Sequence, residues 1–418
     1  MYALVDANSF YCSAEQVFRP DWRGKPIIVL SNNDGMVVAA NRQAKEVGVP
    51  KFQPYFKIKE LCERKGVIAL SSNYELYSDL SEKMMQVIGR FAPEQHVYSI
   101  DESFLRFNKC RGLIPDLAKH AFQIRKAVWK ECRLPVCVGM GKTVTLAKAA
   151  NHAAKKIKGL NGICVIDSDE FRTNILKQVD VSDVWGIGRK LTTKLRIMKI
   201  KTAYDLSLYS PERARREFSI EMERTVRELN GFSCISWEGA RADKKQIFST
   251  RSMGQRITDL DSLQQALSKH IAIAAYKARQ QGSLCKVMMC FASSSPYDDK
   301  PVSLKSIHHF AYPTDDTKVL TQVVMAIAKQ LFKADVRYYK IGVGLLDLIP
   351  AQHQQLDWLN PDPSDHHLMN TFDLINQKYG TDTLFLAAQG IEHKWGMKRE
   401  LLTPQYTTKW KDLPQIKC

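Results

Sequence analysis

The sequence predicts a multidomain α/β protein, because two stretches of the chain alternate strand and helix signals in different orders. In residues 1–165, short β-rich runs are separated by stretches in which apolar residues recur at three- and four-residue spacing, as in amphipathic helices. In residues 244–348 the order is β-α-β-β-α-β, which indicates one sheet with two helices on one face. The chain has 418 residues, enough for two to four domains of roughly 100–200 residues each.

The expected elements follow in chain order. In the first stretch, strands are expected at 2–5, 27–31, 97–107, 135–139 and 162–166, and helices at 80–91 and 117–131. Residues from about 167 to 240 are charged and helical in pattern, with a loop at 184–190. Farther along, strands are expected at 246–252, 284–291, 303–310 and 339–346, with helices from about 261 and 320, a polar linker at 350–366 and a helix at 368–378.

The charge of the chain points to an acidic partner. Sixty-one Lys+Arg against 44 Asp+Glu leave a formal net charge of +17, and nucleic acid is the commonest partner of so basic a protein. No run approaches the ~20 apolar residues of a membrane span, and the N-terminus lacks the basic region of a signal peptide. Ten cysteines without a CxxC pair or zinc-ligand spacing favour reduced thiols in the cytoplasm.

Three carboxylates stand in strand-like, apolar surroundings. Asp6 ends the apolar run 2–5, and Asp101 and Glu102 lie inside the run 96–104. Ionised carboxylates among buried strands are costly unless they are paired or bind a metal. Oxygen donors of this kind suit Mg²⁺, and two such ions roughly 3.5–4 Å apart can promote phosphoryl transfer.

Two interpretations of these acids remain open from the residues alone. A regular strand sends the side chains of Asp101 and Glu102 to opposite faces, so both reach one pair of metal ions only if a hairpin turn or bulge lies there. The alternative is that the acids form ordinary salt bridges with Lys or Arg.

Ordered motifs along the chain resemble the Y-family (translesion) DNA polymerases. These motifs are Val5-Asp6-Ala7-Asn8-Ser9-Phe10-Tyr11, Ser99-Ile100-Asp101-Glu102-Ser103-Phe104, Thr145-Leu146-Ala147-Lys148 and Asn151-His152-Ala153-Ala154-Lys155. Within that family the runs 30–35, 71–77, 184–188, 395–399 and 406–408 are similar to the UmuC type, the catalytic subunit of bacterial DNA polymerase V. The resemblance extends from residue 1 to about residue 415.

The resemblance implies an error-prone polymerase of SOS-type damage tolerance that adds dNMP to a primer 3′ end on a DNA template. Its right-hand architecture would comprise a palm (1–30 and 78–166), fingers (31–77), a helical thumb (167–240), a β-α-β-β-α-β little finger (241–348), and a linker with a C-terminal partner-binding tail (349–418).

The resemblance also assigns the site residues. Asp6, Asp101 and Glu102 would hold two Mg²⁺ ions with the Ala7 carbonyl as a further ligand, and Tyr11 would lie under the deoxyribose and block a 2′-hydroxyl, beside Phe10. Simple core packing is the alternative for these two aromatic residues.

Lys148, Arg42 and Lys45 would handle the triphosphate, since cations stabilise the charge on the leaving pyrophosphate. This chain has Arg42 and Lys45 where relatives commonly have Tyr and Arg, and Val144 where they usually have Lys, with Lys142 two positions earlier. The roles of Arg42 and Lys142 are therefore open, and a solvated surface is the alternative for any single basic residue.

DNA contacts are expected in two places. Gly186, Gly188, Arg189 and Lys190 resemble the hairpin of a helix-hairpin-helix module, whose glycines let backbone N–H groups approach a phosphate at a helix N-terminus. A plain helix-connecting turn is the alternative. In the little finger, the candidate phosphate contacts are Lys244, Lys245, Arg251, Arg256 and Lys286, which would fix register without reading sequence.

The linker carries a predicted partner motif. Gln355, Leu356, Trp358 and Leu359 resemble the pentapeptide by which bacterial polymerases bind the β sliding clamp, and a mobile tether raises local concentration. Packing of these apolar residues against the little finger is the alternative. The resemblance further implies a UmuD′-type dimer and RecA as partners.

Two other functions compete with the polymerase. A DNA-binding scaffold would recruit repair partners and carry inert acids, and a two-metal nuclease would cleave strands instead of extending them. The acid triad disfavours the scaffold, and no further acidic cluster that could form a proofreading site supports the nuclease.

Overall fold

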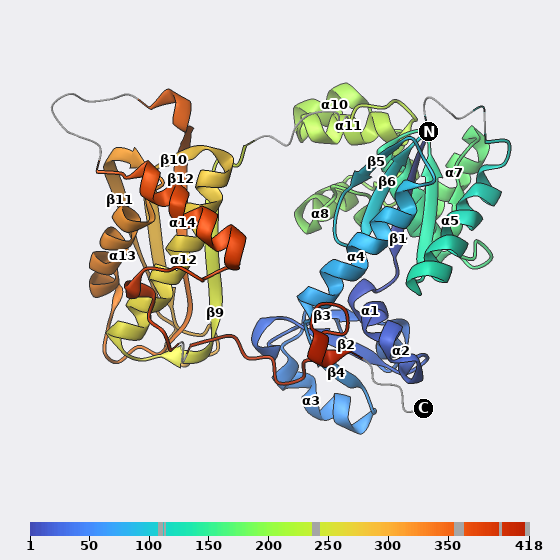
Figure 1. The fold of residues 1–418 in the computed structure, drawn as a ribbon. Coiled ribbons are helices and arrows are strands. Elements are labelled where there is room, and N and C mark those ends of the chain that lie inside the picture. The colour runs from blue at the N-terminus through green and yellow to red at the C-terminus, as the bar shows by residue number, and fades with distance from the viewer. Residues whose placement is uncertain (108–111, 113, 236–242, 355–362, 393–394, 414–418) are drawn as a thin grey trace. The chain divides into compact units, whose positions relative to one another are not determined.

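The computed structural model describes the chain except residues 108–111, 113, 236–242, 355–362, 393–394 and 414–418 (Figure 1). The chain divides into two compact units, the first built from residues 1–239 and 400–418 and the second from residues 240–399. The first unit contains a five-stranded and a three-stranded sheet, and the second a four-stranded sheet. The predicted multidomain α/β class is therefore confirmed.

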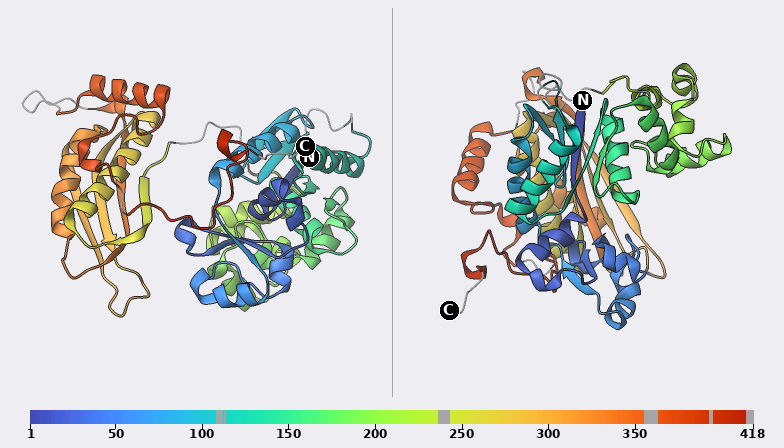
Figure 2. Two further views of the ribbon diagram at one scale, coloured as in Figure 1. Left: turned by 60° about the horizontal axis from the view of Figure 1, so that its bottom comes forward. Right: turned by 90° about the vertical axis from the view of Figure 1, so that its right-hand side faces the viewer.

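The five-stranded sheet has the order β5-β6-β1-β7-β8. Its strands are β1 (Tyr2–Ala7), β5 (Glu94–Val97), β6 (Glu102–Arg106), β7 (Val136–Gly141) and β8 (Ile163–Val165). Successive side chains of a strand point to opposite faces. Ala3 and Val5 pack with α4 (Tyr74–Gly89) and α5 (Leu117–Cys132), whereas Leu4 packs on the other face with α6 (Val144–Lys156). Helices thus cover both faces of this sheet (Figure 2). Asp6 shares the face of Leu4 and so looks toward α6.

Helix α6 packs unusually closely on the sheet because β7 contains glycine. A Cβ at Gly139 would lie 2.0 Å from the backbone nitrogen of Asn151, so any other residue would push the helix away. Asn151 is 2 % exposed, and its Nδ2 donates to the carbonyls of Leu4 (3.1 Å) and Cys137 (2.9 Å). This hydrogen-bonded amide holds α6 at a fixed height over β1 and β7.

The three-stranded sheet has the order β3-β2-β4, formed by β3 (Val37–Ala40), β2 (Ile27–Leu30) and β4 (Ile68–Ser71). Ile28 and Leu30 pack with α2 (Arg42–Glu46) and α3 (Tyr55–Arg64). Ile27 and Val29, on the opposite face, join the core that contains α1 (Phe10–Phe18) and α4. The apolar run of β2 is thus continuous because both of its faces are covered.

A set of helices follows β8 and shares a core with α6. These helices are α7 (Asp169–Gln178), α8 (Arg189–Ile197), α9 (Ala203–Ser207), α10 (Pro211–Glu217) and α11 (Ile220–Leu229). Glu228 of α11 is fully buried, and its Oε2 accepts a hydrogen bond of 2.9 Å from the Thr145 amide in the first turn of α6. A carboxylate at this position is favourable for the helix dipole and joins α11 to α6.

The second unit is an antiparallel sheet of order β11-β10-β12-β9. In chain order its elements are β9 (Ile247–Ile257), α12 (Leu260–Gln281), β10 (Ser283–Ser293), β11 (Ser303–Thr314), α13 (Thr317–Leu331) and β12 (Tyr338–Pro350). Both helices contribute to one core with the sheet. The predicted order β-α-β-β-α-β is confirmed, and α14 (His366–Tyr379) follows it.

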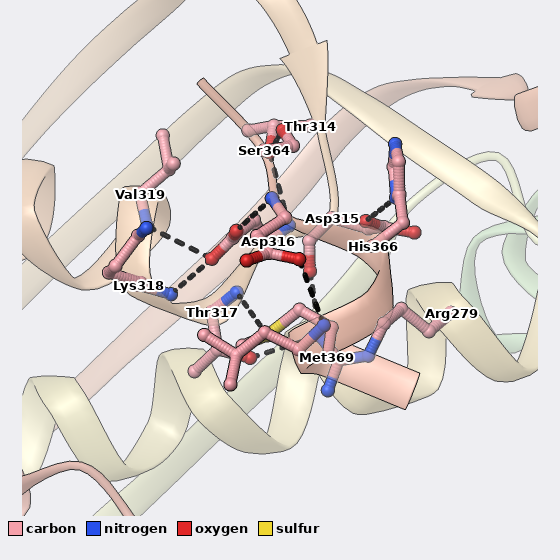
Figure 3. A network of polar contacts seen from close by, with 12 residues as sticks. Arg279, Thr314, Asp315, Asp316, Thr317, Lys318, Val319, Ser364, His366 and Met369 are labelled. Atoms are coloured by element: carbon pink, nitrogen blue, oxygen red, sulfur yellow. Dashed lines mark hydrogen bonds and ion pairs between the residues drawn. The ribbon is translucent and has the colours of Figure 1, made fainter. Parts of the chain in front are cut away.

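Polar contacts join α14 to this unit (Figure 3). Arg279 of α12 donates from Nε and Nη2 to both carboxyl oxygens of Asp373, each at 2.8 Å, and from Nη1 to the Asp315 carbonyl at 2.7 Å. The Asp365 amide donates to Oδ2 of Asp316. The side chains of the Arg279–Asp373 pair are only 7 % and 12 % exposed, so each charge depends on the other.

Short 3₁₀ helices complete the described secondary structure at Pro20–Trp22, Asn32–Asp34, Val181–Asp183, Ala351–His353, Ala387–Gln389 and Trp410–Asp412. In the part of the chain that the structure describes, no helix combines the length and the apolar character needed to cross a membrane.

Arg279→Met tests the anchoring of α14. Removing one partner of a buried ion pair leaves the other charge unpaired, so the free energy of opening α14 should fall by about 3 kcal/mol. Faster amide hydrogen exchange across residues 366–379 of the full chain would show this change. Arg224→Met is the control, because Arg224 pairs with Glu221 on the surface and such pairs contribute about 0–1 kcal/mol. Unchanged exchange in α14 would contradict the anchoring role.

Candidate active site

The three predicted acids meet at one end of β1. Asp6 lies directly opposite Glu102 in the antiparallel register of β1 and β6, and the Ala7 amide donates to the Asp101 carbonyl at 3.0 Å. A hairpin turn lies between β5 and β6, closed by hydrogen bonds from the amides of Tyr98 and Ser99 to the Glu102 carbonyl. The expected turn is present, and it brings residues 101 and 102 together with residue 6.

Each carboxylate has a partner in the structure. Asp6 Oδ2 is 2.6 Å from Lys155 Nζ, and Glu102 Oε1 is 2.8 Å from Lys148 Nζ. Asp101 Oδ1 accepts a 2.7 Å hydrogen bond from the Ser99 hydroxyl. Among the described residues, no three His, Cys, Asp or Glu side chains are already arranged around one metal position. Asp6 and Glu102 therefore form salt bridges with lysines in this structure, as the alternative interpretation expects.

The charge balance of the acids nevertheless fits a divalent cation. Burial raises the pKa of Asp6 to about 6; Lys155 opposes this shift, whereas Glu102 and Asp101 add to it. The carboxylates therefore repel one another when all are ionised, and additional positive charge would relieve this repulsion. Carboxylate and carbonyl oxygens are the ligands that Mg²⁺ prefers, so the donor set fits this ion.

A cavity of about 1130 Å³ in the first unit opens beside the acids. Asp6, Asp101 and Tyr11 line it together with a set of basic residues: Arg42, Lys45, Lys51, Arg125, Lys155, Lys156 and Lys158. Burial, followed by the nearby charges of Lys51, Lys156 and Lys155, lowers the pKa of Lys45. A bound anion would relieve the repulsion between cations this close together, and a triphosphate is an anion of suitable charge.

Sequence reasoning missed Lys51, Lys155 and Lys156. A signal for Lys155 was present, because it follows Lys148 by seven residues, which is about two helical turns. Both residues therefore lie on one face of α6, the face that looks toward β1 and β6.

Lys148 lies outside the residues that line the cavity. Besides its ion pair with Glu102, its Nζ is 4.4 Å from the ring centroid of Tyr98 and 5.4 Å from that of Trp185. Arg42 is exposed and pairs with Glu46 at 2.7 Å, and Lys142 is 3.8 Å from Asp169. Contact of Lys148, Arg42 or Lys142 with a triphosphate stays a prediction.

The aromatic floor of the cavity is formed by Tyr11. Its ring stacks on that of Tyr77 with centroids 4.6 Å apart and an interplanar angle of 16°, and Tyr74 meets it edge-on at 6.1 Å. Phe10 is 3 % exposed and belongs to the core of the sheet. Both residues line the cavity, but Phe10 is mostly covered by the core whereas Tyr11 is half-buried, and contact of either with a nucleotide stays a prediction.

Behind this floor lies a buried acid that sequence reasoning also missed. Glu15 is fully buried, and its Oε1 accepts a 2.6 Å hydrogen bond from the Tyr77 hydroxyl. Burial raises the pKa of Glu15 to about 7, opposed by the hydroxyls of Tyr77 and Thr403.

The hairpin before α8 has the geometry expected of it. Gly186 adopts φ +89°, which favours glycine, and Gly188 is the N-cap of α8. Gly186, Gly188, Arg189 and Lys190 are all exposed. Their contact with phosphate stays a prediction.

The candidate DNA contacts of the second unit differ in exposure. Lys244, Lys245 and Lys286 are exposed, whereas Arg251 and Arg256 are half-buried. Arg256 pairs with Asp298 at 2.6 Å. Arg251 lies near α12, where it adds to the effect of burial in lowering the pKa of His270 to about 4. The clamp motif residues Gln355, Leu356, Trp358 and Leu359 lie outside the described residues.

The fold is that of a Y-family DNA polymerase. A structure described as the Y-family DNA polymerase chimera Dbh-Dpo4(243-245)-Dbh matches with a TM-score of 0.64 and 20% identity, covering 83% of this chain and 99% of that one. An insertion ternary complex of Dbh DNA polymerase matches with a TM-score of 0.52 and 22% identity, with the same coverage.

Sequence comparisons specify the family. The chain is 39% identical to Protein UmuC of Salmonella typhimurium (strain LT2) over 423 residues, with 100% of both chains covered. It is 37% identical to Protein MucB of Escherichia coli over 420 residues, covering 99% of each. DNA polymerase IV of Dehalococcoides mccartyi (strain CBDB1) is 25% identical over 394 residues, which cover 90% of this chain and 94% of the relative.

Residues 5–152 match the impB/mucB/samB family, residues 244–358 match its C-terminal domain, and residues 366–416 match a domain of unknown function, DUF4113. The chain therefore belongs to the impB/mucB/samB family, the UmuC type of Y-family translesion DNA polymerases. The predicted activity, that of an error-prone DNA-directed DNA polymerase, is confirmed.

Glu15→Gln tests the buried acid. Because the pKa of Glu15 is raised from its ordinary value of 4.5 to about 7, the folded chain binds the proton more tightly than the unfolded chain. The wild type should therefore lose stability as pH rises from 4.5 to 7, by about 3 kcal/mol relative to the Gln variant. Below pH 4.5 the two should converge. Differential scanning calorimetry across this range measures the effect.

The control is Glu82→Gln, which removes the same charge from an exposed position of α4. It should give no gain that grows with pH. A constant difference between the Glu15→Gln variant and the wild type from pH 4.5 to 8 would contradict the raised pKa.

Proposed function

We propose that this polymerase uses Asp6, Asp101 and Glu102, with the Ala7 carbonyl, to hold two Mg²⁺ ions at the primer 3′ end. The observation that carries this proposal is the register that sets Asp6 opposite Glu102, with Asp101 in the adjoining turn at a cavity lined by cations. When bound, such ions supply activation of the attacking hydroxyl and stabilisation of the leaving pyrophosphate.

The side chains around the acids orient them and balance their charge. The Ser99 hydroxyl holds one oxygen of Asp101 and leaves the other for a ligand. Lys155 on Asp6 and Lys148 on Glu102 hold the acids in place, and Lys155 opposes the rise in the pKa of Asp6. Lys45, Lys51, Lys155 and Lys156 are the residues best placed to bind the triphosphate, because all four line the cavity.

Tyr11 is the residue that selects the sugar in this proposal. It lines the same cavity as Asp6 and Asp101, and its ring is backed by Tyr77. A ring that cannot recede leaves no room for a 2′-hydroxyl, so deoxyribonucleotides are preferred.

The sheets correspond to the named parts of a right-hand polymerase in this proposal. The five-stranded sheet forms the palm (1–30 and 78–166), the three-stranded sheet the fingers (31–77), the helices of 167–240 the thumb, and the four-stranded sheet the little finger (241–348). The candidate contacts to the DNA backbone are the exposed Gly186, Gly188, Arg189 and Lys190 of the thumb and Lys244, Lys245 and Lys286 of the little finger, with Arg251 and Arg256 as weaker candidates.

The proposed partners are a UmuD′-type dimer, RecA and the β sliding clamp, in the bacterial cytoplasm at the nucleoid. The net charge of +17 suits a protein that works on nucleic acid. The clamp contact would use Gln355, Leu356, Trp358 and Leu359.

Asp101→Asn and Glu102→Gln test the metal proposal. Each removes a negative metal ligand and should lower dNTP incorporation at least about 100-fold, since metal ions contribute several kcal/mol of transition-state charge stabilisation. Primer extension by the full chain with Mg²⁺, the accessory dimer, RecA and clamp measures the rate, and fluorescence anisotropy measures DNA binding, which should be retained. Glu82→Gln is the matched control. Full incorporation by either variant would defeat the proposal.

The joint change Leu356→Ala with Trp358→Ala tests the clamp proposal. Loss of two large apolar anchors should weaken binding to the β clamp by about 100-fold or more, as measured by surface plasmon resonance, while unassisted DNA binding is unchanged. Leu374→Ala is the control, because Leu374 is 64 % exposed on α14. Equal clamp binding by wild type and the double variant would exclude this motif.

A further inference from the structure

Residues 400–406, which we name the C-terminal strap, belong to the first unit and are bound there at the end of β4. The Glu400 amide donates to Asp34 Oδ2 at 3.0 Å, and the Leu401 amide donates to the Ser71 hydroxyl at 2.9 Å. The Ser71 amide donates in turn to the Leu401 carbonyl at 3.0 Å. The strap is therefore held beside β4 by one backbone hydrogen bond and by two bonds from its amides to side chains.

Asn73, two residues after Ser71, joins the strap to α4. Asn73 is fully buried, and its Nδ2 lies within hydrogen-bond distance of the Thr403 hydroxyl (3.0 Å), the Thr403 carbonyl (3.2 Å) and the Pro404 carbonyl (3.2 Å). Asn73 is also the N-cap residue of α4, and its Oδ1 accepts a hydrogen bond from the Leu76 amide. One side chain thus holds both the strap and the first turn of α4, which carries Tyr77.

Thr403 also lies near the buried acid behind the nucleotide cavity. Its hydroxyl helps to oppose the raised pKa of Glu15, whose Oε1 accepts from the Tyr77 hydroxyl. Glu15 Oε2 is buried and, among the described residues, has no partner at hydrogen-bond distance. This carboxyl group is costly to bury and depends on the few hydroxyls around it.

The same strap contacts the far end of α1. Tyr406 stacks on Phe18 with ring centroids 4.8 Å apart and an interplanar angle of 18°. Tyr11 and Glu15 lie one helical turn apart on α1. The strap thus contacts α1 at its last residue, Phe18, and contacts α4, which carries Tyr77, at its N-cap residue, Asn73.

We propose that the C-terminal strap determines sugar selectivity: Thr403, through Asn73, Glu15 and Tyr77, keeps the ring of Tyr11 where it excludes a 2′-hydroxyl. This inference rests on the proposed role of Tyr11. It assigns a function to the end of the segment 366–416, which matches a domain of unknown function. Thr403, Glu15 and Tyr77 are positioning residues, because they act through Tyr11.

The physical reason is that steric exclusion works only if the blocking ring cannot retreat. Tyr77 is 0 % exposed and stacked on Tyr11 at 4.6 Å, so Tyr11 recedes only if Tyr77 moves. Tyr77 is held by its own hydroxyl on Glu15, and Glu15 by its buried surroundings, Thr403 included. Loosening this chain of contacts leaves the acids and lysines intact and enlarges the space beneath the sugar.

The experiment measures kcat/KM for a dNTP and for the matching rNTP with the full chain and its accessory proteins. Thr403→Val removes the hydroxyl and keeps the shape, and Tyr77→Phe removes the other hydroxyl and keeps the ring. Each should raise the rNTP/dNTP ratio by about 3- to 10-fold, the effect of one buried hydrogen bond. Combined, they should raise it by less than the product of the single effects, since contacting residues are coupled.

Two matched variants serve as controls. Thr403→Ser retains the hydroxyl and should keep the wild-type ratio. Thr407→Val removes the hydroxyl of the residue that directly follows the strap. This hydroxyl is buried without a hydrogen-bond partner among the described residues, so the rNTP/dNTP ratio of the variant should stay within about twofold of the wild type. A general loss of stability would lower both efficiencies and leave their ratio unchanged.

An unchanged ratio in Thr403→Val, when this variant extends primers with dNTP, would overturn the inference, as would an unchanged ratio in Tyr77→Phe. So would an equal rise in Thr407→Val. If the Thr403→Val chain does not fold, Thr403→Ala, which also lacks the hydroxyl and is smaller, takes its place and should raise the ratio in the same way. Failure of the proposed function is distinguishable, because then the wild type does not extend primers or Tyr11→Ala leaves the ratio unchanged.

Discussion

The antiparallel pairing of β1 with β6 is the constraint on which the rest of the site depends. It places Asp6 opposite Glu102, and the turn before β6 adds Asp101. Three carboxylates at the end of a buried sheet repel one another, and the pKa of Asp6, raised to about 6 by burial first of all, reflects this cost. Lysine side chains around this cluster supply the positive charge that it requires.

Helix α6 supplies two of these charges. Lys148 and Lys155 reach Glu102 and Asp6 because Gly139 lets the helix approach the sheet and Asn151 bonds it to two strand carbonyls. Glu228 of α11, bonded to the first turn of α6, fixes the other end. A shift of this helix by a fraction of a turn would separate both lysines from the acids, so packing and electrostatics are inseparable here.

The C-terminal residues are integral to both units. Helix α14 is held to the second unit by the Arg279–Asp373 pair, and Trp395 lies in the core of that unit. Residues 400–406 are bound in the first unit beside Asn73, a helix N-cap. The sequence predicted a linker with a C-terminal partner-binding tail over 349–418; the described part of this segment has structural contacts of its own, and its predicted partners remain proposals.

The sequence alone predicted the β-α-β-β-α-β order of the second unit, the family and the candidate acids, because these follow from local periodicity and from motifs of contiguous residues. In the first unit it treated β5 and β6 as one strand and did not predict β3 or β4, whose pairing depends on distant segments. It could not place Glu15 behind Tyr11 or separate Lys148 from the cavity, since these depend on which residues from distant segments meet. Thr403 and Asn73 are 330 residues apart, and Lys51 and Lys156 line one cavity from distant parts of the sequence. Only tertiary packing brings such groups within hydrogen-bond or Coulomb range, and that range sets their chemistry.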